Sequence, residues 1–256
     1  MQNFLTILLV LGLLGRADAD WVPGKFTERG TLPGNAVAWE REVTSGDRTV
    51  RLSGVSFSEK DDVFRVIEND PAARKPLFTA LRENGAFAGV NGGYFHPDFT
   101  PLGLVISGGE TLHGFERAKL LSGILAVRGN RIELVRAGSF KAGADVREAL
   151  QSGPWLVENG AVVPGLNAVR LARRTLVAGD GKGNWAILTT SPATLAETAE
   201  LLAAPGLIGG WTVRNALNLD GGSSTMLLAL AGENPVIDIP SYGPVRNYLA
   251  IIPRRR

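Results

Sequence analysis

The sequence predicts an α+β fold: a single domain with a mixed, largely antiparallel sheet, several hairpins and two or three helices. Three observations favour this fold. The 256 residues include 32 glycines and 14 prolines, which implies many turns. Several glycine-containing turns lie between short apolar segments, and two longer segments space apolar residues as a helix does. Because 45% of residues are hydrophobic and 20% are charged, the chain can bury a substantial core.

The first half of the chain is expected to alternate strands with one helix. The predicted elements are a hairpin, a third strand, a helix and a buried strand, over residues 36–43 with 48–57, 63–69, 71–84 and 86–90. Asp70 is expected to cap the helix, with Pro71 at its first position and Gly85 at its end.

The second half is expected to hold further hairpins, a helix and a last strand. Turns at residues 129–130, 159–160 and 181–183 separate apolar arms, and Asn-Gly at 159–160 favours a two-residue hairpin loop. The remaining predictions are a helix from Ser191-Pro192 to Pro205-Gly206, a short helix over 207–216 and a strand over 246–253.

The N-terminus resembles a secretory signal. Residues 4–14 are apolar, too short a run to span a bilayer comfortably, and small residues follow at 17 and 19. We therefore expect a signal peptide over residues 1–19 and a domain over residues 20–256. The mature protein would then be periplasmic or extracellular, without stable insertion in the membrane. An apolar N-terminal strand or anchor is the alternative.

Composition excludes several classes of site. The chain has no cysteine and two histidines, so thiolate chemistry, disulfides and a three-histidine zinc site are excluded. With a formal net charge of +2 and no basic stripe interleaved with aromatic residues, nucleic acid is not expected as a partner. No cofactor or metal is predicted, although Ca²⁺ or Mg²⁺ on oxygen ligands stays open.

Residues 220–224 place a carboxylate, two glycines and two serines directly after an apolar segment. Consecutive glycine amides can form an anion-binding concavity, to which serine hydroxyls add donors. Because a carboxylate repels an anion, Asp220 would then face an electron-poor carbon or a metal. The segment equally fits a glycine turn in which Asp220 accepts backbone hydrogen bonds, and these residues alone do not decide between the two.

Four other polar segments also have two interpretations each. The two glycines of residues 91–95 either expose amides to a ligand or only let the chain turn. Gln151 and Ser152, expected between a helix and a strand, either bond sugar hydroxyls or cap the helix. The planar forks of Arg174 and Arg246 suit phosphate oxygens, although surface arginines are common.

Taken together, the motifs resemble the phosphodiester glycosidase domain family. In the family's order and approximate spacing, over residues 85–252, the chain carries NGGYF, LQSGPWLVENG, RRTLVAGD, LNLDGGSSTM and VRNYLAIIP. It departs from the family in having two glycines after the aspartate where three are frequent. The resemblance implies hydrolysis of a sugar-1-phosphodiester at the glycosidic C–O bond, which releases free sugar and leaves a phosphomonoester. The expected partner is therefore a carbohydrate phosphodiester.

The resemblance also implies roles for individual residues. Asp220 would act at the anomeric carbon as nucleophile, base or electrostatic stabiliser. The residues expected to bond sugar hydroxyls or position water are Asn91, Gln151 and Ser223. The residues expected to bind substrate or its phosphate are Gly92, Gly93, Tyr94, His96, Ser152, Arg174, Gly221, Gly222, Ser224 and Arg246. Asp98 and Glu116 are candidates for a second carboxylate, although a phosphodiester, as a good leaving group, needs little general-acid help.

Three other functions stay open on the sequence. The same phosphate contacts would serve a non-catalytic cell-envelope module that binds a phosphorylated glycan. A phosphodiesterase that cuts the P–O bond, or an ordinary glycosidase, is a second alternative, although a metal-dependent phosphodiesterase normally shows a His and Asp cluster. A structural protein with glycine turns is the third.

Overall fold

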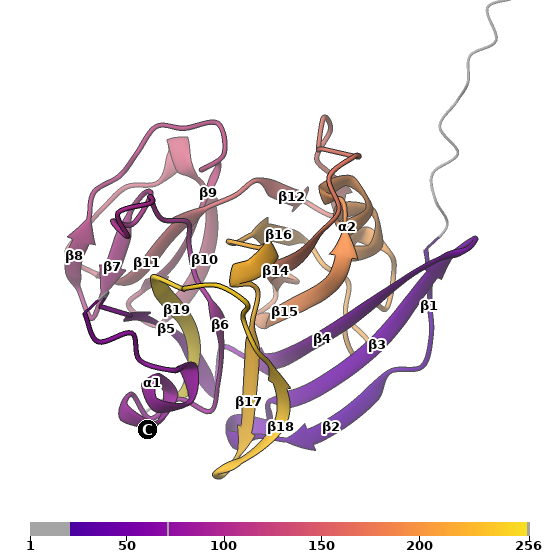
Figure 1. Ribbon diagram of the computed structural model, residues 1–256, viewed down its shortest axis with the longest axis horizontal. Coiled ribbons are helices and arrows are strands. Elements are labelled where there is room, and N and C mark those ends of the chain that lie inside the picture. Colours follow the sequence, from indigo (N-terminus) through magenta and orange to yellow (C-terminus); the bar gives the residue numbers. More distant parts are fainter. Residues whose placement is uncertain (1–20, 71, 255–256) are drawn as a thin grey trace, which may run out of the picture.

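Three antiparallel sheets and two short α-helices make up the computed structural model, which describes residues 21–70 and 72–254 (Figure 1). Every strand pair in these two stretches is antiparallel, which confirms the largely antiparallel pairing expected from the sequence. The predicted signal peptide over residues 1–19 lies outside the described residues.

The strands are divided among a nine-stranded sheet and two five-stranded sheets. In spatial order, the large sheet holds β1 (Val22–Pro23), β3 (Val37–Ser45), β4 (Arg48–Ser58), β15 (Asn184–Ala193), β14 (Ala172–Gly179), β16 (Asn215–Asn218), β12 (Trp155–Glu158) and β13 (Ala161–Val162), with β2 (Thr27–Thr31) paired to β3. The second sheet holds β10 (Arg131–Arg136), β9 (Gly123–Arg128), β11 (Val146–Ser152), β7 (Val105–Ser107) and β8 (Glu110–His113). The third holds β18 (Asn234–Ile239), β17 (Leu227–Ala231), β6 (Ala88–Asn91), β19 (Asn247–Pro253) and β5 (Asp62–Glu68).

The helical part is smaller than the α+β expectation, so the fold is better described as β-rich. The two α-helices are α1 (Leu77–Glu83) and α2 (Leu195–Ala203), and the single-turn 3₁₀ segments are η1 (Pro33–Asn35), η2 (Ala137–Ser139) and η3 (Gly222–Ser224). Residues 207–216, expected as a helix, instead form a bridge between Ile208 and Trp211 and then enter β16. Gly209 and Gly210 adopt positive φ there, which a helix does not allow.

The starts of the two helices differ from the sequence prediction for local reasons. The Asp70 carboxylate accepts a hydrogen bond from the Ala72 amide in a turn, and α1 begins only after Pro76. The residue before a proline is pushed away from helical geometry, so the helix cannot extend back across Pro76. Likewise, α2 is capped by Thr194 and Glu197 in a capping box, whereas Ser191 and Pro192 still belong to β15.

The hairpins follow the turn chemistry of the sequence. Asn159 and Gly160 join β12 to β13 with φ of 53° and 84°, as a two-residue loop with two positive φ values requires. The turns at residues 129–130 and 181–183 join β9 to β10 and β14 to β15 as expected. The prediction of a helix before Gln151 is wrong, because Gln151 lies within β11, which pairs with β9 and β7.

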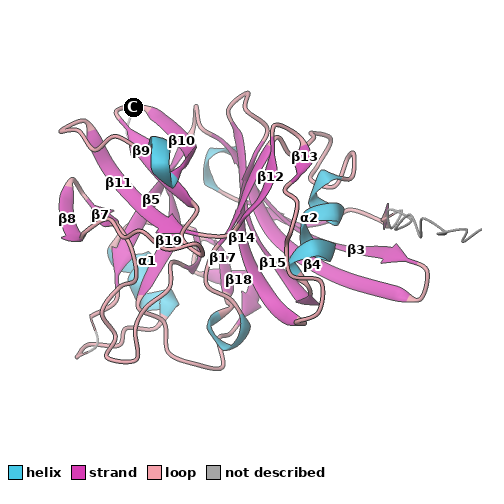
Figure 2. Ribbon diagram, turned by 90° about the horizontal axis from the view of Figure 1, so that it is seen from above, coloured by secondary structure: helices cyan, strands magenta, loops and turns pink. Residues whose placement is uncertain are grey.

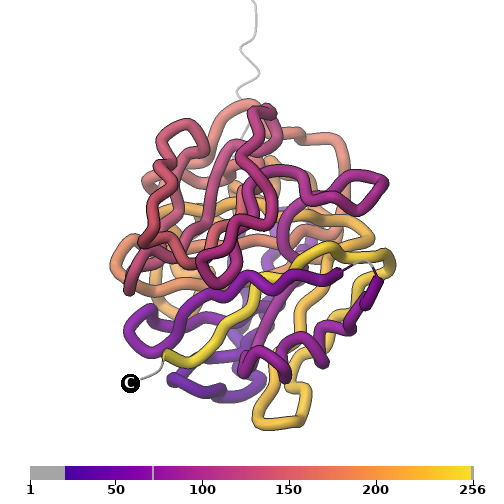
Figure 3. The backbone as a smooth tube through the Cα atoms, turned by 90° about the vertical axis from the view of Figure 1, so that its left-hand side faces the viewer, coloured from indigo at the N-terminus to yellow at the C-terminus, as the bar shows by residue number. Residues whose placement is uncertain are grey.

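One apolar core joins the three sheets. It takes side chains from each of them, among them Val55, Val90 and Leu150. Seen from above in Figure 2, the large sheet occupies one side, β7, β8, β9 and β11 occupy the other, and β17 and β19 lie between them. In Figure 3 the violet β5 and the yellow β19 run side by side, as their pairing requires.

The segment after β16 is held between two sheets. The Leu219 amide donates to the carbonyl of Thr175 on β14 at 2.8 Å, and the Asp220 amide donates to the carbonyl of Gly92, after β6, at 3.0 Å. This junction brings the ends of β6, β14 and β16 together, and it is where the polar motifs meet. In the part of the chain described, no helix is long and apolar enough to cross a membrane.

Candidate active site

A cavity of about 290 Å³ opens at this junction. Its lining residues come from six separate stretches of the chain: Tyr94, Leu120, Pro154, Asn167, Arg170, Ala172, Arg174, Leu195, Asn218, Asp220, Gly221 and Gly222. Of the residues expected from the sequence, the cavity therefore brings together Tyr94, Arg174, Asp220, Gly221 and Gly222.

Asp220 is the single acidic side chain that lines this cavity. Its Oδ1 accepts a hydrogen bond from the Gly221 amide at 2.8 Å, and the Ser224 hydroxyl also bonds its carboxylate. Burial raises the pKa of Asp220, and these two hydrogen bonds oppose that rise. The cavity thus holds one desolvated carboxylate whose orientation is set by its own turn.

The Asn91 side chain holds the Asp220 turn in place. Its side-chain amide donates to the Asp220 carbonyl at 2.7 Å, and its Oδ1 accepts from the Thr175 hydroxyl at 2.7 Å and from the Met226 amide at 3.1 Å. With three protein partners and 1% exposure, the side chain is a link between β6, β14 and the loop after β16. Asn91 does not line the cavity, so it acts on Asp220 only through the hydrogen bond to the Asp220 carbonyl.

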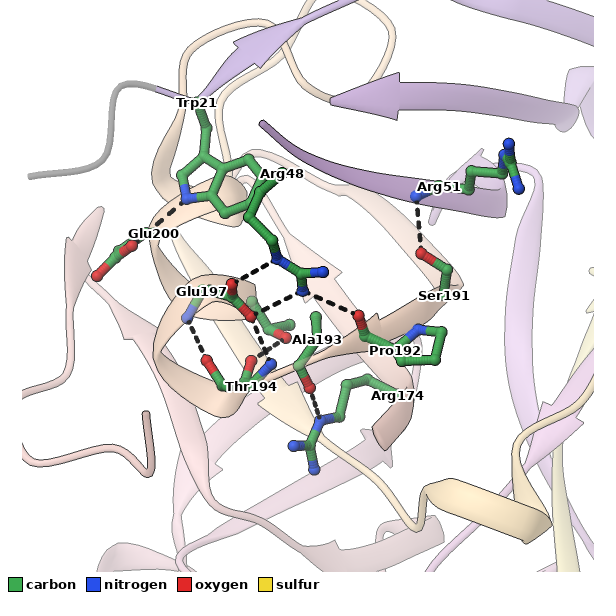
Figure 4. A network of polar contacts seen from close by, with 11 residues as sticks. Trp21, Arg48, Arg51, Arg174, Ser191, Pro192, Ala193, Thr194, Glu197 and Glu200 are labelled. Atoms are coloured by element: carbon green, nitrogen blue, oxygen red, sulfur yellow. Dashed lines mark hydrogen bonds and ion pairs between the residues drawn. The ribbon is translucent and has the colours of Figure 1, made fainter. Parts of the chain in front are cut away.

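Arg174 lines the cavity as a buried cation. Its guanidinium donates through Nε to the carbonyl of Ala193 at 2.9 Å (Figure 4). Its Nη2 donates to the carbonyl of Arg170 at 2.7 Å. The nearby Glu197 carboxylate is bonded instead by Arg48, at 3.0 and 3.2 Å, and by the Thr194 amide. Burial lowers the pKa of Arg174, yet a guanidinium stays charged at neutral pH.

No carboxylate forms an ion pair with Arg174 or Arg170 in the described ranges. Arg170 is exposed and reaches the same cavity from the loop before β14. Burying a cation without a counter-charge is costly, so such a group favours an anion beside it. The cavity therefore has a positive side at Arg170 and Arg174 and a negative side at Asp220.

Tyr94 and Asn218 line the same cavity and are bonded to each other. The Tyr94 hydroxyl donates to the Gly153 carbonyl at 2.7 Å and accepts from Asn218 Nδ2 at 2.8 Å, and the same Nδ2 donates to Gly153 at 3.1 Å. Burial, and next the charge of Asp220, raise the pKa of Tyr94 well above its usual range, whereas Asn218 and both arginines oppose the rise. Tyr94 is thus a neutral hydroxyl at physiological pH.

Three polar residues of the cavity were not expected from the sequence: Asn167, Arg170 and Asn218. A signal was present for Asn218, because it stands two residues before Asp220 on an extended segment and side chains at that spacing face the same side. Asn167 and Arg170 lie in the loop between β13 and β14, which has no periodic pattern to mark them.

The amides of Gly92 and Gly93 have protein partners. Both donate to Asn247, to its carbonyl and its Oδ1 respectively, at 2.8 Å. A Cβ on Gly92 would lie 2.0 Å from that Oδ1, so glycine is required for the close approach of the two strands. These amides therefore tie the NGG turn to β19 and leave phosphate contacts to other groups.

Four further predicted residues also lie outside the cavity lining. Gln151 Oε1 accepts from the amides of Leu104 and Glu116, and its Nε2 donates to the carbonyls of Glu116 and Leu121. Arg246 pairs with Glu68 at 2.6 Å and donates to the carbonyls of Asn69 and Phe99. Ser152 is fully buried, and Ser223 is exposed to solvent.

The remaining predicted side chains are placed as follows. Ser224 bonds Asp220, as above, whereas His96 lies on an exposed loop beside Asp98, whose carboxylate bonds Thr100 within that loop. Glu116 accepts from the Gly103 amide at 3.1 Å. Neither Asp98 nor Glu116 reaches the cavity, so Asp220 has no second carboxylate beside it there. Within residues 21–70 and 72–254, no group of three or more His, Asp or Glu side chains could hold a metal ion.

Comparisons with known proteins identify the family of this chain. A model of the phosphodiester glycosidase family matches residues 84–252. The uncharacterized protein YigE of Escherichia coli (strain K12) is 31% identical over 114 residues, 41% of this chain and 45% of that protein. The match therefore spans less than half the length of that relative.

Solved structures show the same fold at low sequence identity. The catalytic domain of zebrafish N-acetylglucosamine-1-phosphodiester alpha-N-acetylglucosaminidase is 16% identical, with a TM-score of 0.65 over 91% of this chain and 88% of that chain. A hypothetical protein from Synechocystis is 19% identical, with a TM-score of 0.58 over 86% of this chain and 62% of that chain. Since the family model covers most of the sequence and includes every motif at the cavity, the chain belongs to the phosphodiester glycosidase family.

Proposed function

We propose that this protein hydrolyses a sugar-1-phosphodiester at the glycosidic C–O bond, releasing free sugar and a phosphomonoester. The observation that carries the proposal is the shared cavity of Asp220 and Arg174, one half-buried carboxylate and one buried cation without an acidic partner in the described residues. In a sugar-1-phosphodiester, the anionic phosphate would match the arginine side of the cavity, and the electron-poor anomeric carbon would match the Asp220 side.

The phosphate would lie at the positive side. Arg174 keeps part of its guanidinium fork after donating to two carbonyls, and Arg170 adds a second cation. Charge-assisted bonds from such a fork are among the strongest that proteins make to phosphate. As the C–O bond breaks, its electron pair goes to the phosphate oxygen, and these cations stabilise the charge that develops there.

The sugar would lie at the negative side, with the anomeric carbon facing Asp220. The carboxylate either attacks that carbon or takes the proton of an attacking water. One carboxylate suffices, because a phosphomonoester leaves readily without protonation. Stereochemistry separates the two routes: direct attack followed by hydrolysis retains the anomeric configuration, and attack by water inverts it.

The experiment is a turnover assay. The protein is incubated with a panel of sugar-1-phosphodiesters, and free reducing sugar is measured. In ¹⁸O-water the label is expected on the sugar, whereas label on the phosphate would indicate P–O cleavage. Binding of these substrates without release of sugar would favour the non-catalytic envelope module.

We also propose export to the periplasm or the exterior after removal of residues 1–19. The apolar run at residues 4–14, followed by small residues at 17 and 19, supports this. The mass of the exported protein tests it, because cleavage should leave Asp20 as the first residue.

A further inference from the structure

Large apolar side chains that are exposed to solvent gather on the loops around the cavity. Of eight such residues in the described part of the chain, five lie on three loops, residues 114–122, 163–171 and 240–246: Phe115, Leu120, Val169, Leu171 and Tyr242. Val169 is 85% exposed and Tyr242 is 78% exposed. Single exposed apolar residues are ordinary, but a cluster of them marks an interaction surface.

Two of these loops border one opening. Leu120 from the first loop and Asn167 and Arg170 from the second line the same cavity. The third loop lines a neighbouring cavity and is bonded next to this one, since the Tyr242 amide donates to the Ser223 carbonyl at 2.7 Å, one residue beyond the lining residue Gly222.

Tyr242 is also fixed in position by a cation. The Arg173 guanidinium stands 4.3 Å from the centre of the Tyr242 ring, and Arg173 directly precedes the lining residue Arg174. The tyrosine ring is thus held in place by Arg173 while remaining exposed. We call Leu120, Val169, Leu171 and Tyr242 the mouth rim.

The charge around the mouth rim is positive. Arg117, Lys119 and Arg170 are exposed, and none of them has an ion pair within the described residues. The loops 163–171 and 240–246 contain no Asp or Glu, and the single acid of loop 114–122, Glu116, bonds the Gly103 amide. An apolar rim with cations beside it complements an anionic amphiphilic surface.

We propose that the mouth rim docks on the surface of an anionic phospholipid bilayer, so that the cavity receives a sugar-1-phosphodiester whose aglycone is a lipid. Val169 and Leu171 enter the boundary between headgroups and acyl chains, Tyr242 lies at the headgroup level, and the cations face anionic lipid. The docking stands on the surface alone, whereas the identity of the substrate rests on the proposed function.

Vesicle binding tests the docking. The chain beginning at Asp20 is used, because the described fold begins at Trp21 and residues 4–14 are themselves apolar. We expect binding to vesicles of phosphatidylcholine mixed with phosphatidylglycerol, little binding to phosphatidylcholine alone, and weakening with added salt. The double variant Val169→Ser/Leu171→Ser should bind at least about tenfold more weakly. Val22→Ser, which changes a residue 61% exposed on β1, is the matched control and should bind as the parent protein does.

Failure to bind the mixed vesicles, or equal binding by the double variant, would overturn the docking. Self-association that the double variant abolishes, without vesicle binding, would assign the mouth rim to a second copy instead.

A kinetic experiment then addresses the substrate. The double variant should release sugar normally from a soluble short-chain phosphodiester, but several-fold more slowly from a lipid phosphodiester in vesicles. Vesicle binding without release from any substrate would reject the proposed function and leave the docking intact.

Discussion

The side-chain amide of Asn91 donates to the backbone carbonyl of Asp220 at 2.7 Å, across 129 positions of sequence. This bond joins the NGG turn after β6 to the DGG turn after β16. Since Asn91 also accepts from Thr175 and Met226, one buried amide fixes the position of the acidic turn relative to both neighbouring strands.

Asn91→Ala should therefore destabilise the fold and misplace Asp220. One buried and two partly buried groups lose their partner, and we expect a loss of unfolding free energy of about 2–4 kcal/mol. Urea denaturation measures it, and the turnover number of the remaining folded protein should fall as well. Thr175→Val, which removes a single bond to Asn91, is the milder control, with a loss of about 1 kcal/mol. Unchanged turnover in folded Asn91→Ala would contradict the positioning role.

Asp220→Asn should abolish most activity without loss of stability. The change keeps the shape of the side chain but removes its charge, so sugar release should slow by at least about a hundredfold. The unfolding free energy should stay equal or rise, because a desolvated charge is removed. Asp238→Asn alters an exposed acid outside the cavity and should behave as the parent protein does. Full activity in Asp220→Asn would exclude this carboxylate from the reaction.

The pH dependence of activity should follow the same carboxylate. Burial raises the pKa of Asp220 above that of an ordinary aspartate, and the reactive form is the ionised one. Activity should therefore rise with pH through a limb that lies above the ordinary aspartate range. A rate profile measured on one soluble phosphodiester checks this, and a limb at or below the usual aspartate pKa would disagree with the buried environment.

Arg174→Lys should weaken substrate binding more than it slows the reaction. Lysine keeps the charge but loses the planar fork, along with the bonds to Ala193 and Arg170. We expect KM for the phosphodiester to rise about tenfold or more. Arg214→Lys, at an exposed arginine bonded to Asn159, provides the control for an arginine-to-lysine change. If KM for Arg174→Lys stayed within about twofold of the parent value, phosphate binding would have to be assigned elsewhere.

Stability should depend on pH through Asp62. This side chain is fully buried, and within the described residues its two oxygens have no hydrogen-bond partner. Burial, and next the charge of Asp61, raise its pKa to about 7, against the opposing charge of Arg254. Because the folded pKa lies above the unfolded one, this contribution to stability is fully present below about pH 4 and is lost as the pH rises through 7.

Asp62→Asn should remove that part of the pH dependence. At pH 8 the variant should be more stable than the parent protein, on the order of 1–3 kcal/mol, whereas the two should be similar at pH 4. Chemical denaturation at the two pH values measures the difference. The dependence that remains belongs in part to Glu148, whose pKa burial also raises to about 7. Equal differences at both pH values would show that Asp62 does not titrate in this range.

Much of the fold could be predicted from the sequence, because the responsible signals are local. Asn159-Gly160 specifies a hairpin through its own positive φ values, whatever it packs against. Helix ends were less predictable. Pro76 and the capping box of Thr194 and Glu197 decide where the two helices begin. Asp70 and Ser191, which the sequence suggests as helix starts, lie instead in a turn and in a strand.

Glycine-rich polar turns at the ends of apolar strands, in the order of the phosphodiester glycosidase family, are visible in the sequence alone. Which of these turns face the cavity depends on how the sheets pack. Gln151, Arg246 and the amides of Gly92 and Gly93 have partners within the protein, whereas Arg174 and Asp220 line the cavity. A polar group takes its partners from whichever segments fold against it, and those segments are distant in the sequence.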